Sequence, residues 1–94
     1  MIKVTVIYFE PFLSLAQKRE EEITLESRSV GTTINHLINQ LVKQYGEEFS
    51  KFAGQKDTYP ATVFLREGET ATLKRDTILK DGDRIIIAMP VGGG

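Results

Sequence analysis

The stretch RIIIAMP, residues 84–90, is nearly continuously apolar and rich in β-branched side chains. Both properties are typical of a strand in the middle of a sheet, where side chains are covered on two faces. The preceding stretch ILKDGD, residues 78–83, contains the pair Asp81-Gly82, which favours a tight turn. These residues therefore predict a turn followed by a central strand, around which the other elements are placed.

The beginning of the sequence predicts two more strands. In residues 2–9, IKVTVIYF, apolar residues first alternate with polar ones, and the last three positions are all apolar. Residues 10–18 predict one or two helical turns, with Pro11 at the first helical position. Residues 19–26 alternate again and predict a half-exposed strand. The acidic run Glu20–Glu22 is interpreted as the solvated beginning of this strand.

The clearest helix in the sequence is SVGTTINHLINQLVKQYG, residues 29–46. Its apolar residues recur at steps of three and four, which predicts an amphipathic helix that covers one face of a sheet. Ser29 is a suitable N-cap and Gly46 a suitable stop, and Thr32 is an alternative start. The apolar stripe comprises Val30, Ile34, Leu37, Ile38, Leu41, Val42 and Tyr45.

A long connection follows this helix. Residues 47–60 exceed the usual length of a connection between two elements. Phe49 and Phe52 are predicted to attach a short helical turn to the core, and Gly54 is predicted to end that turn. The connection is therefore expected to contain structure of its own.

The order of the elements predicts the topology. Residues 61–66 and 69–73 predict two short strands joined by a tight turn at residues 67–68. A helical crossover usually returns the chain parallel to an earlier strand. We therefore expect the last strand to lie beside the first, in a mixed sheet of four to five strands with one main helix across it. This α+β arrangement is the ubiquitin-like β-grasp, and it is assigned to a single domain over residues 1–91.

The composition indicates an ordinary globular domain. The chain has 94 residues, 40% hydrophobic and 27% charged, and no cysteine, so it has neither disulfides nor a thiolate nucleophile. The sequence contains no apolar run of about 18 residues and no signal-peptide pattern. A cytoplasmic protein without a membrane partner is therefore expected. A net charge of −1 with mixed signs argues against nucleic acid as the main partner.

Few side chains suggest catalytic or metal chemistry. His36 is the sole histidine and lies on the polar side of the main helix, so it is interpreted as a surface residue. A single imidazole gives no basis for a catalytic triad. Asp81 and Asp83 flank Gly82, but a calcium loop needs more oxygen ligands and a distal glutamate. We therefore expect neither a metal site nor a stand-alone enzyme.

The glycine tail, residues 92–94, is the most informative functional feature and is expected to be flexible. Glycine has no Cβ, so such a tail enters a channel too narrow for other residues. An extended segment from Pro90 to Gly94 spans roughly 15–18 Å, enough to carry a terminal carboxylate into the active site of a partner. ATP activates such a carboxylate as an acyl-adenylate, which a sulfur donor or an amine then attacks. On the glycines alone, an inert frayed end is an equal alternative.

Four stretches of the sequence carry a resemblance to a known family. They are VIYFEPFLSLA (6–16), EEEITL (20–25), the helix 29–46 and LKDGDRIIIAMPVGGG (79–94). They resemble, in turn, the opening, the second strand, the main helix and the closing segment of the MoaD family, the small sulfur-carrier subunit of molybdopterin synthase. The resemblance covers most of the chain and is weakest at residues 46–60. Its most specific part is the turn, the apolar strand and the Pro-Val-x-Gly-Gly ending.

The resemblance implies a carrier and not an enzyme. Gly94 would be adenylated by a ubiquitin-activating-type enzyme that uses ATP, and then converted to a thiocarboxylate. Gly93 would lie beside it in the narrow channel, and Gly92 stands where the family commonly has serine or alanine. The carrier itself would bind no cofactor. The docking surface implied by the family carries over to Phe9, Met89, Pro90, Val91 and Gly92.

The resemblance leaves alternatives open at two levels. For Phe9 and Met89, packing in the core is an equal alternative to docking. The pathway that the resemblance implies first is molybdopterin (molybdenum cofactor) biosynthesis, with the large subunit of molybdopterin synthase as the sulfur acceptor. The same tail also suits carriers for thiazole (thiamine) synthesis of the ThiS type, carriers for tRNA thiolation, and small archaeal modifiers that Gly94 would join to lysines. A third class is a β-grasp interaction module with an inert tail.

Overall fold

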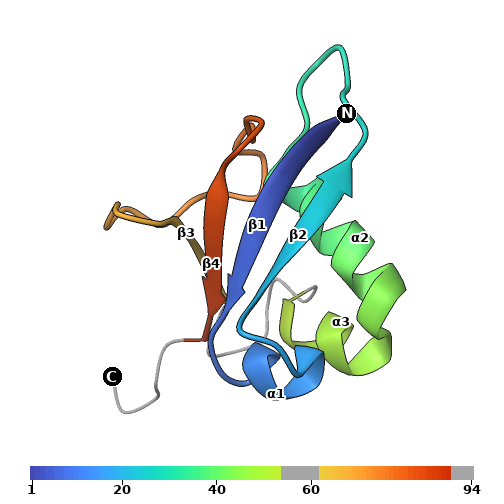
Figure 1. The fold of residues 1–94 in the computed structure, drawn as a ribbon, viewed down its shortest axis with the longest axis vertical. Coiled ribbons are helices and arrows are strands. Elements are labelled where there is room, and N and C mark those ends of the chain that lie inside the picture. Colours follow the sequence, from blue (N-terminus) through green and yellow to red (C-terminus); the bar gives the residue numbers. More distant parts are fainter. Residues whose placement is uncertain (54–61, 90–94) are drawn as a thin grey trace.

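The computed structural model describes residues 1–53 and 62–89, which form one sheet and three helices (Figure 1). The bounds follow the predicted strands and helices, with ends that differ by a few residues. In chain order the elements are β1 (Ile2–Tyr8), α1 (Phe12–Ala16), β2 (Glu20–Leu25), α2 (Ile34–Tyr45), α3 (Glu47–Ala53), β3 (Val63–Arg66) and β4 (Arg84–Ala88).

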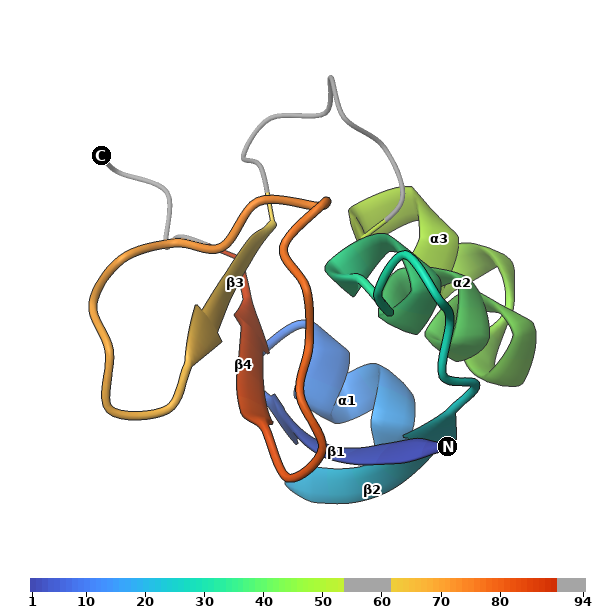
Figure 2. The same cartoon turned by 90° about the horizontal axis from the view of Figure 1, so that it is seen from above.

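The sheet confirms the predicted topology. Its strand order is β2-β1-β4-β3, with β1 antiparallel to β2 and parallel to β4, and β3 antiparallel to β4. The apolar strand β4 thus lies beside β1 in the middle of the sheet. The helices lie on one side of the sheet, as the view from above shows (Figure 2). This is the mixed sheet of the β-grasp fold, with four strands among the described residues.

The turn before β4 is fastened to the start of β1. The Lys3 amide donates to Asp81 Oδ1 at 2.8 Å, and the Gly82 amide donates to the Lys3 carbonyl at 2.7 Å. Gly82 has a φ of +89°, which glycine adopts without strain. Asp83 Oδ2 accepts the Lys80 amide at 2.8 Å. The Asp-Gly-Asp motif is therefore a turn, as predicted, and it fixes where β4 begins beside β1.

The core fills the space between the sheet and the helices. Phe49 of α3 is fully buried and stacks on Tyr45, with ring centroids 5.6 Å apart. It also packs against Phe12 of α1, at 5.1 Å. This confirms the predicted role of Phe49, while the predictions for the Phe52 side chain and for Gly54 lie outside what the structure describes. The sheet contributes Val4, Val6, Tyr8, Ile23, Leu25, Phe64, Ile85 and Ile87 to the core.

The main helix begins later than its apolar pattern predicts. Its N-cap is Thr33, not Ser29 or Thr32. Gly31 has a φ of +100°, far from helical values, so the helix cannot extend back through it. A side chain at Gly31 would also meet Ile78, since a Cβ there would lie 3.0 Å from it. Val30 is consequently 84% exposed and does not belong to the apolar stripe.

His36 belongs to the cap of this helix. Its Nδ1 accepts the Thr33 backbone amide at 2.9 Å, and its own amide donates to Thr33 Oγ1 at 3.4 Å. The residue is half-buried, so the interpretation as a plain surface residue is wrong. His36 thus takes the position that glutamate has in a usual capping box.

Two further local predictions are wrong. Residues 69–73 form no strand, because after the turn at Gly68 the segment is mostly polar and exposed, with little to bury against the sheet. The Glu69 amide closes the turn on the Arg66 carbonyl of β3 at 2.9 Å, and the Leu73 amide bonds back to the Phe64 carbonyl at 2.7 Å. Helix α1 begins at Phe12, and Pro11 is its N-cap and not its first residue.

Candidate functional site

The described part of the chain ends one residue after the central strand β4. β4 ends at Ala88, and Met89 is half-buried and packs against the core. The contact favours the core-packing interpretation for Met89. The other predicted residues of this segment lie outside the described residues: Pro90, Val91, Gly92, Gly93 and Gly94.

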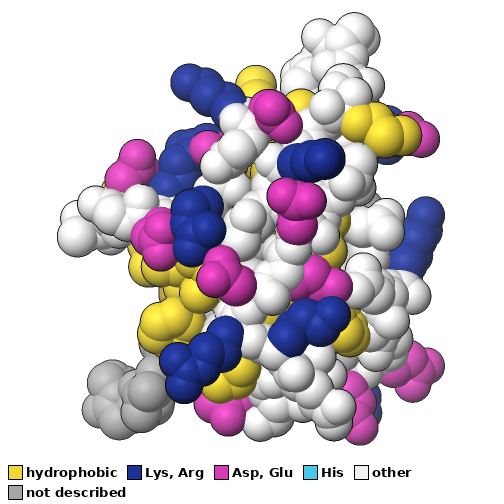
Figure 3. All heavy atoms as spheres, in the orientation of Figure 1, with side chains coloured by type: hydrophobic (Ala, Val, Ile, Leu, Met, Phe, Trp, Pro, Cys, Tyr) yellow, Lys and Arg dark blue, Asp and Glu magenta, His cyan; other side chains and the backbone are white. Residues whose placement is uncertain are grey.

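The face of the sheet opposite the helices carries apolar side chains near this point. Ile7 and Leu65 lie in register on either side of Ile86, and Val63 pairs with Ala88. Alternation along the strands places all five on the outer face, and all are half-buried. We call these five residues the outer apolar row. In the space-filling view, hydrophobic side chains gather at the lower left of this face (Figure 3).

Phe9 extends the outer apolar row beyond the end of β1. It is 53% exposed, so core packing does not account for its side chain. Its amide bonds to the Ile87 carbonyl at 3.0 Å, which holds it next to the end of β4. A cavity of about 300 Å³ opens beside it, with Leu13 and Arg19 among its lining. Phe9 is therefore available to a partner that approaches the end of β4.

Ion pairs border the outer apolar row. Arg84 donates from Nε to Glu67 at 2.6 Å and from its terminal nitrogen to Glu20 at 3.1 Å. This links β2, β4 and the turn after β3 across the outer face. Figure 3 shows charged side chains of both signs over the middle of the same face. The apolar area is therefore confined to one end of the sheet.

The sequence predicted Phe9, which the structure leaves exposed, and it did not indicate most of the outer apolar row. Ile86 was hidden because a continuous apolar run does not tell which residues face the core. The break in alternation at Ile7 was a usable signal, since it marks a strand that is apolar on both faces. Leu65 had no such signal, because it ends the short apolar run at residues 63–65, which does not tell which residues face the core.

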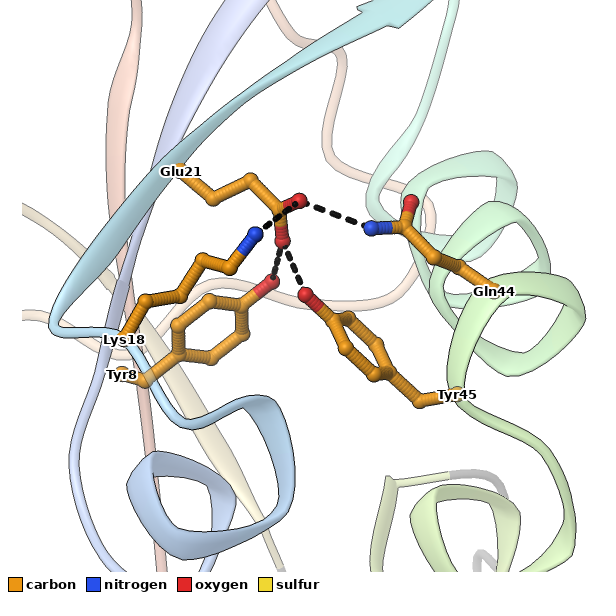
Figure 4. Close-up of polar contacts among 5 residues, drawn as sticks. All are labelled: Tyr8, Lys18, Glu21, Gln44 and Tyr45. Atoms are coloured by element: carbon orange, nitrogen blue, oxygen red, sulfur yellow. Dashed lines mark hydrogen bonds and ion pairs between the residues drawn. The ribbon is translucent and has the colours of Figure 1, made fainter.

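Glu21 lies on the helix side of the sheet and joins three elements (Figure 4). The hydroxyls of Tyr8 and Tyr45 both donate to its Oε1, the former at 2.8 Å. Gln44 Nε2 at 2.7 Å and Lys18 Nζ at 3.2 Å donate to Oε2. We call these five residues the Glu21 cluster. The interpretation of Glu20–Glu22 as a solvated strand beginning is therefore wrong for Glu21, and Glu20 is paired with Arg84.

The electrostatics of the Glu21 cluster favour a charged carboxylate among protonated tyrosines. Burial alone raises the pKa of Glu21, but the hydrogen bonds from Tyr45, Tyr8, Gln44 and Lys18 outweigh it and lower the pKa. Burial, and then the hydrogen bond to Glu21, raise the pKa of Tyr8 and of Tyr45. Each group thus has its partner in the cluster, and the cluster connects β1 and β2 to α2. Glu21, Tyr8 and Tyr45 keep their protonation states around neutral pH. We assign it a structural role.

Replacing Glu21 by glutamine is expected to lower the free energy of unfolding by about 1–2 kcal/mol, since bonds to a charged acceptor are weakened. A lowered folded-state pKa stabilises the fold above the ordinary value of about 4.3. This contribution is lost as the pH falls through the lowered pKa. The deficit of Glu21→Gln should therefore be full at neutral pH and shrink in acid. Thermal melts across pH test this, with Glu22→Gln as the control; equal deficits in the two variants would contradict the role of the cluster.

The described residues contain no group of three or more His, Asp or Glu side chains placed to hold a metal ion. No helix in the described part of the chain is long and apolar enough to traverse a bilayer. The outer apolar row, Phe9 and the end of β4 lie near one another at one end of the sheet.

Comparisons with known proteins agree with this picture. None of the curated proteins compared with the chain matches it. Among solved structures, the putative molybdopterin converting factor, subunit 1, from Pyrococcus furiosus is 33% identical, with a TM-score of 0.76 over 97% of this chain and 100% of that one.

Two more distant structures share the fold. The small archaeal modifier protein 1 (SAMP1) from Methanosarcina acetivorans is 22% identical, with a TM-score of 0.74 over 100% of this chain and 98% of that one. SAMP1 from Haloferax volcanii is 19% identical, with a TM-score of 0.73 over 98% and 99%. The model of the ThiS family matches residues 6–94. Since this match spans nearly the whole sequence, the chain belongs to the ThiS family.

Proposed function

We propose that this protein is a cytoplasmic sulfur carrier for molybdopterin biosynthesis, with Gly94 as the residue that is activated and loaded. The observation that carries the proposal is the 33% identity, over 97% of the chain, to a putative molybdopterin converting factor, subunit 1. The family match runs through the glycine tail to residue 94, which supports a role for that segment. The chain is then a co-substrate of other enzymes and not a catalyst.

The proposed chemistry takes place at the carboxylate of Gly94 in two steps. A carboxylate oxygen attacks the α-phosphorus of ATP, pyrophosphate leaves, and an acyl-adenylate forms in an activating enzyme. A sulfide equivalent then attacks the carbonyl carbon, AMP leaves, and a thiocarboxylate remains. The thiocarboxylate sulfur then bonds to an electrophilic carbon of an acceptor, whose leaving group departs. Water hydrolyses the resulting acyl–sulfur bond, which leaves the sulfur on the acceptor and restores the carboxylate. Gly93 contributes by the absence of a side chain, which lets both steps occur at the end of a narrow channel.

The folded body is proposed to supply affinity for the partners. The outer apolar row and Phe9 lie at the end of the sheet from which Met89 departs. A partner that covers this face therefore receives the tail directly into its active site. Pro90, Val91 and Gly92 remain predicted contacts along that path. An activating enzyme and a sulfur acceptor, such as the large subunit of molybdopterin synthase, are the expected occupants in turn.

Intact-mass measurement tests the proposal. The purified protein is incubated with an activating enzyme of the ubiquitin-activating type, ATP and sulfide. Fragmentation then shows whether the change in mass lies at Gly94. Exchange of one oxygen for sulfur at Gly94 is the expected result. The loaded protein is then mixed with a large subunit of molybdopterin synthase and its precursor substrate. If the loaded protein keeps its thiocarboxylate in that mixture but transfers the sulfur to tRNA or to a thiazole precursor, the protein serves a different pathway.

A second candidate function is conjugation to proteins. Two of the structures with this fold are small archaeal modifier proteins. An acyl-adenylate at Gly94 would also react with lysine amines. Peptide mapping of proteins from native cells distinguishes the two. Lysines joined to the glycine tail support the modifier, and a thiocarboxylate without such conjugates supports the carrier.

Truncating Phe9 is expected to weaken binding to the activating enzyme by about tenfold, the effect of removing one aromatic anchor from an interface. The reason is its exposure beside the end of β4. Titration by calorimetry or fluorescence anisotropy measures this for Phe9→Ala. Val30→Ala is the matched control, since Val30 is an exposed apolar residue in the loop before α2. Equal affinities for wild type and Phe9→Ala would remove Phe9 from the docking surface.

A further inference from the structure

A groove runs between the edge strand β2 and the helix α2, away from the outer apolar row. Its volume is about 700 Å³, and its lining comes from β2, from the loop after β2 and from one side of α2. Figure 1 shows α2 beside β2 at the edge of the sheet. The Glu21 cluster closes the contact between the two elements further along, through Gln44 and Tyr45. These hydrogen bonds join the two walls at that end of the groove and fix their relative position.

The backbone of β2 is free along this groove. β2 is the outermost strand, with β1 on one side and no strand of the described chain on the other. The Tyr8 amide bonds to the Arg19 carbonyl, so strict alternation turns the backbone groups of Glu21 and Ile23 toward β1. The amides and carbonyls of Glu22 and Thr24 point outward. An exposed edge of this kind accepts an added extended strand.

The charged side chains that line the groove favour an added strand with acidic side chains. Arg28 and Lys43 line the groove, and within residues 1–53 and 62–89 neither has an ion pair or side-chain hydrogen bond. Glu26 is the single acidic residue in the lining, so cationic groups outnumber it. On the opposite face of β2 lie Glu20 and Glu22, which disfavour acids on that side. Successive side chains of an added strand point to opposite faces, so acidic side chains are favoured at alternate positions, toward α2.

We propose that the groove between β2 and α2 binds an extended peptide segment of another protein, which pairs with the outward backbone of Glu22 and Thr24 and directs alternate acidic side chains to Arg28 and Lys43. The site is separate from the end of β4. Leu25 at the groove pairs with Ile2 at the start of β1, whereas the end of β4 pairs with Tyr8 at the other end of that strand. A segment bound in the groove therefore does not cover the end of β4.

The test uses a capped peptide in which glutamate alternates with valine, and a matched peptide with glutamine in place of glutamate. Binding is followed by NMR on the full-length protein. The glutamate peptide is expected to shift the amides of Glu22, Thr24 and Lys43 and to bind about tenfold more tightly than the glutamine peptide, from two exposed charge contacts. Reversal of both cations in Arg28→Glu/Lys43→Glu should abolish that difference. Reversal of an exposed lysine elsewhere, Lys80→Glu, should preserve it.

A second pair of variants tests the backbone. Thr24→Pro removes an outward amide that bonds to no other strand, which an edge strand tolerates, and should abolish binding. Thr24→Val keeps the amide and should bind as wild type does. Shifts confined to the outer apolar row would overturn the proposal. The proposal would also be overturned if the glutamate peptide does not bind, or if folded Thr24→Pro binds it as wild type does. Sedimentation that shows a dimer, formed through β2, would overturn it as well.

Discussion

Deleting Gly94 is expected to abolish sulfur loading while leaving the fold unchanged. Loss of one residue withdraws the carboxylate by about 3.3–3.6 Å. A displacement of even about 1 Å from a reacting centre costs on the order of a hundredfold in rate, so a loss beyond a hundredfold is expected. The described core lies between the sheet and the helices, and Ile85 and Ile87 of β4 are its last fully buried residues. The deletion should therefore melt at the wild-type temperature.

An added residue after Gly94 is the complementary variant. It keeps every glycine but replaces the free carboxylate of Gly94 by a peptide bond, so adenylation at that carbon cannot occur. Intact mass after incubation with activating enzyme, ATP and sulfide measures both variants. Substituting Gly92 by alanine is the control, because the family commonly has a small residue there, and it should load normally. Full loading of the extended protein at Gly94 would rule out the terminal-carboxylate mechanism.

Truncating Phe49 to alanine is expected to cause the largest loss of stability, about 3–5 kcal/mol for a fully buried aromatic side chain. Phe49 contacts rings from three elements: Tyr8 of β1, Phe12 of α1 and Tyr45 of α2. Its removal leaves a cavity between these rings, because a rigid sheet and helix cannot close on it. Urea unfolding followed by circular dichroism measures the change.

Two further variants keep this measurement interpretable. Phe49→Leu retains most of the volume and is expected to cost about 1–2 kcal/mol, so it provides a value if Phe49→Ala does not fold. Phe9→Ala removes the same side chain from an exposed position and should cost less than about 1 kcal/mol. A Phe49→Leu protein as stable as wild type would show that α3 is not attached to the core through this ring.

The sequence was sufficient for the strands of the sheet and for the main helix. The apolar run ending at Ala88 and the alternation from Ile2 specified two central strands, and the helix stripe specified the layer that covers them. The Asp81-Gly82 turn completed the topology. Each of these is a strong local signal that the tertiary structure does not contradict.

Two of the wrong predictions depend on contacts between distant residues. Gly31, with its positive φ, lies against Ile78, a residue far away in the sequence. Glu21 is a half-buried acceptor of hydrogen bonds from Tyr8 and Tyr45, which come from other elements. Long-range contacts of this kind leave no local pattern. The glycine tail stays a prediction from the sequence, whereas the outer apolar row could be recognised only from the strand register.

The parallel pairing of β1 with β4 has a consequence for the synthesis of the protein. β1 is made first, yet its partner in the sheet, which supplies the fully buried Ile85 and Ile87, comes after every other element. Contacts between such distant segments form late, since a long loop must close first. A nascent or prematurely terminated chain without β4 thus lacks the centre of its sheet. The outer apolar row, which includes residues of β4, therefore forms only on chains that have been synthesised through β4.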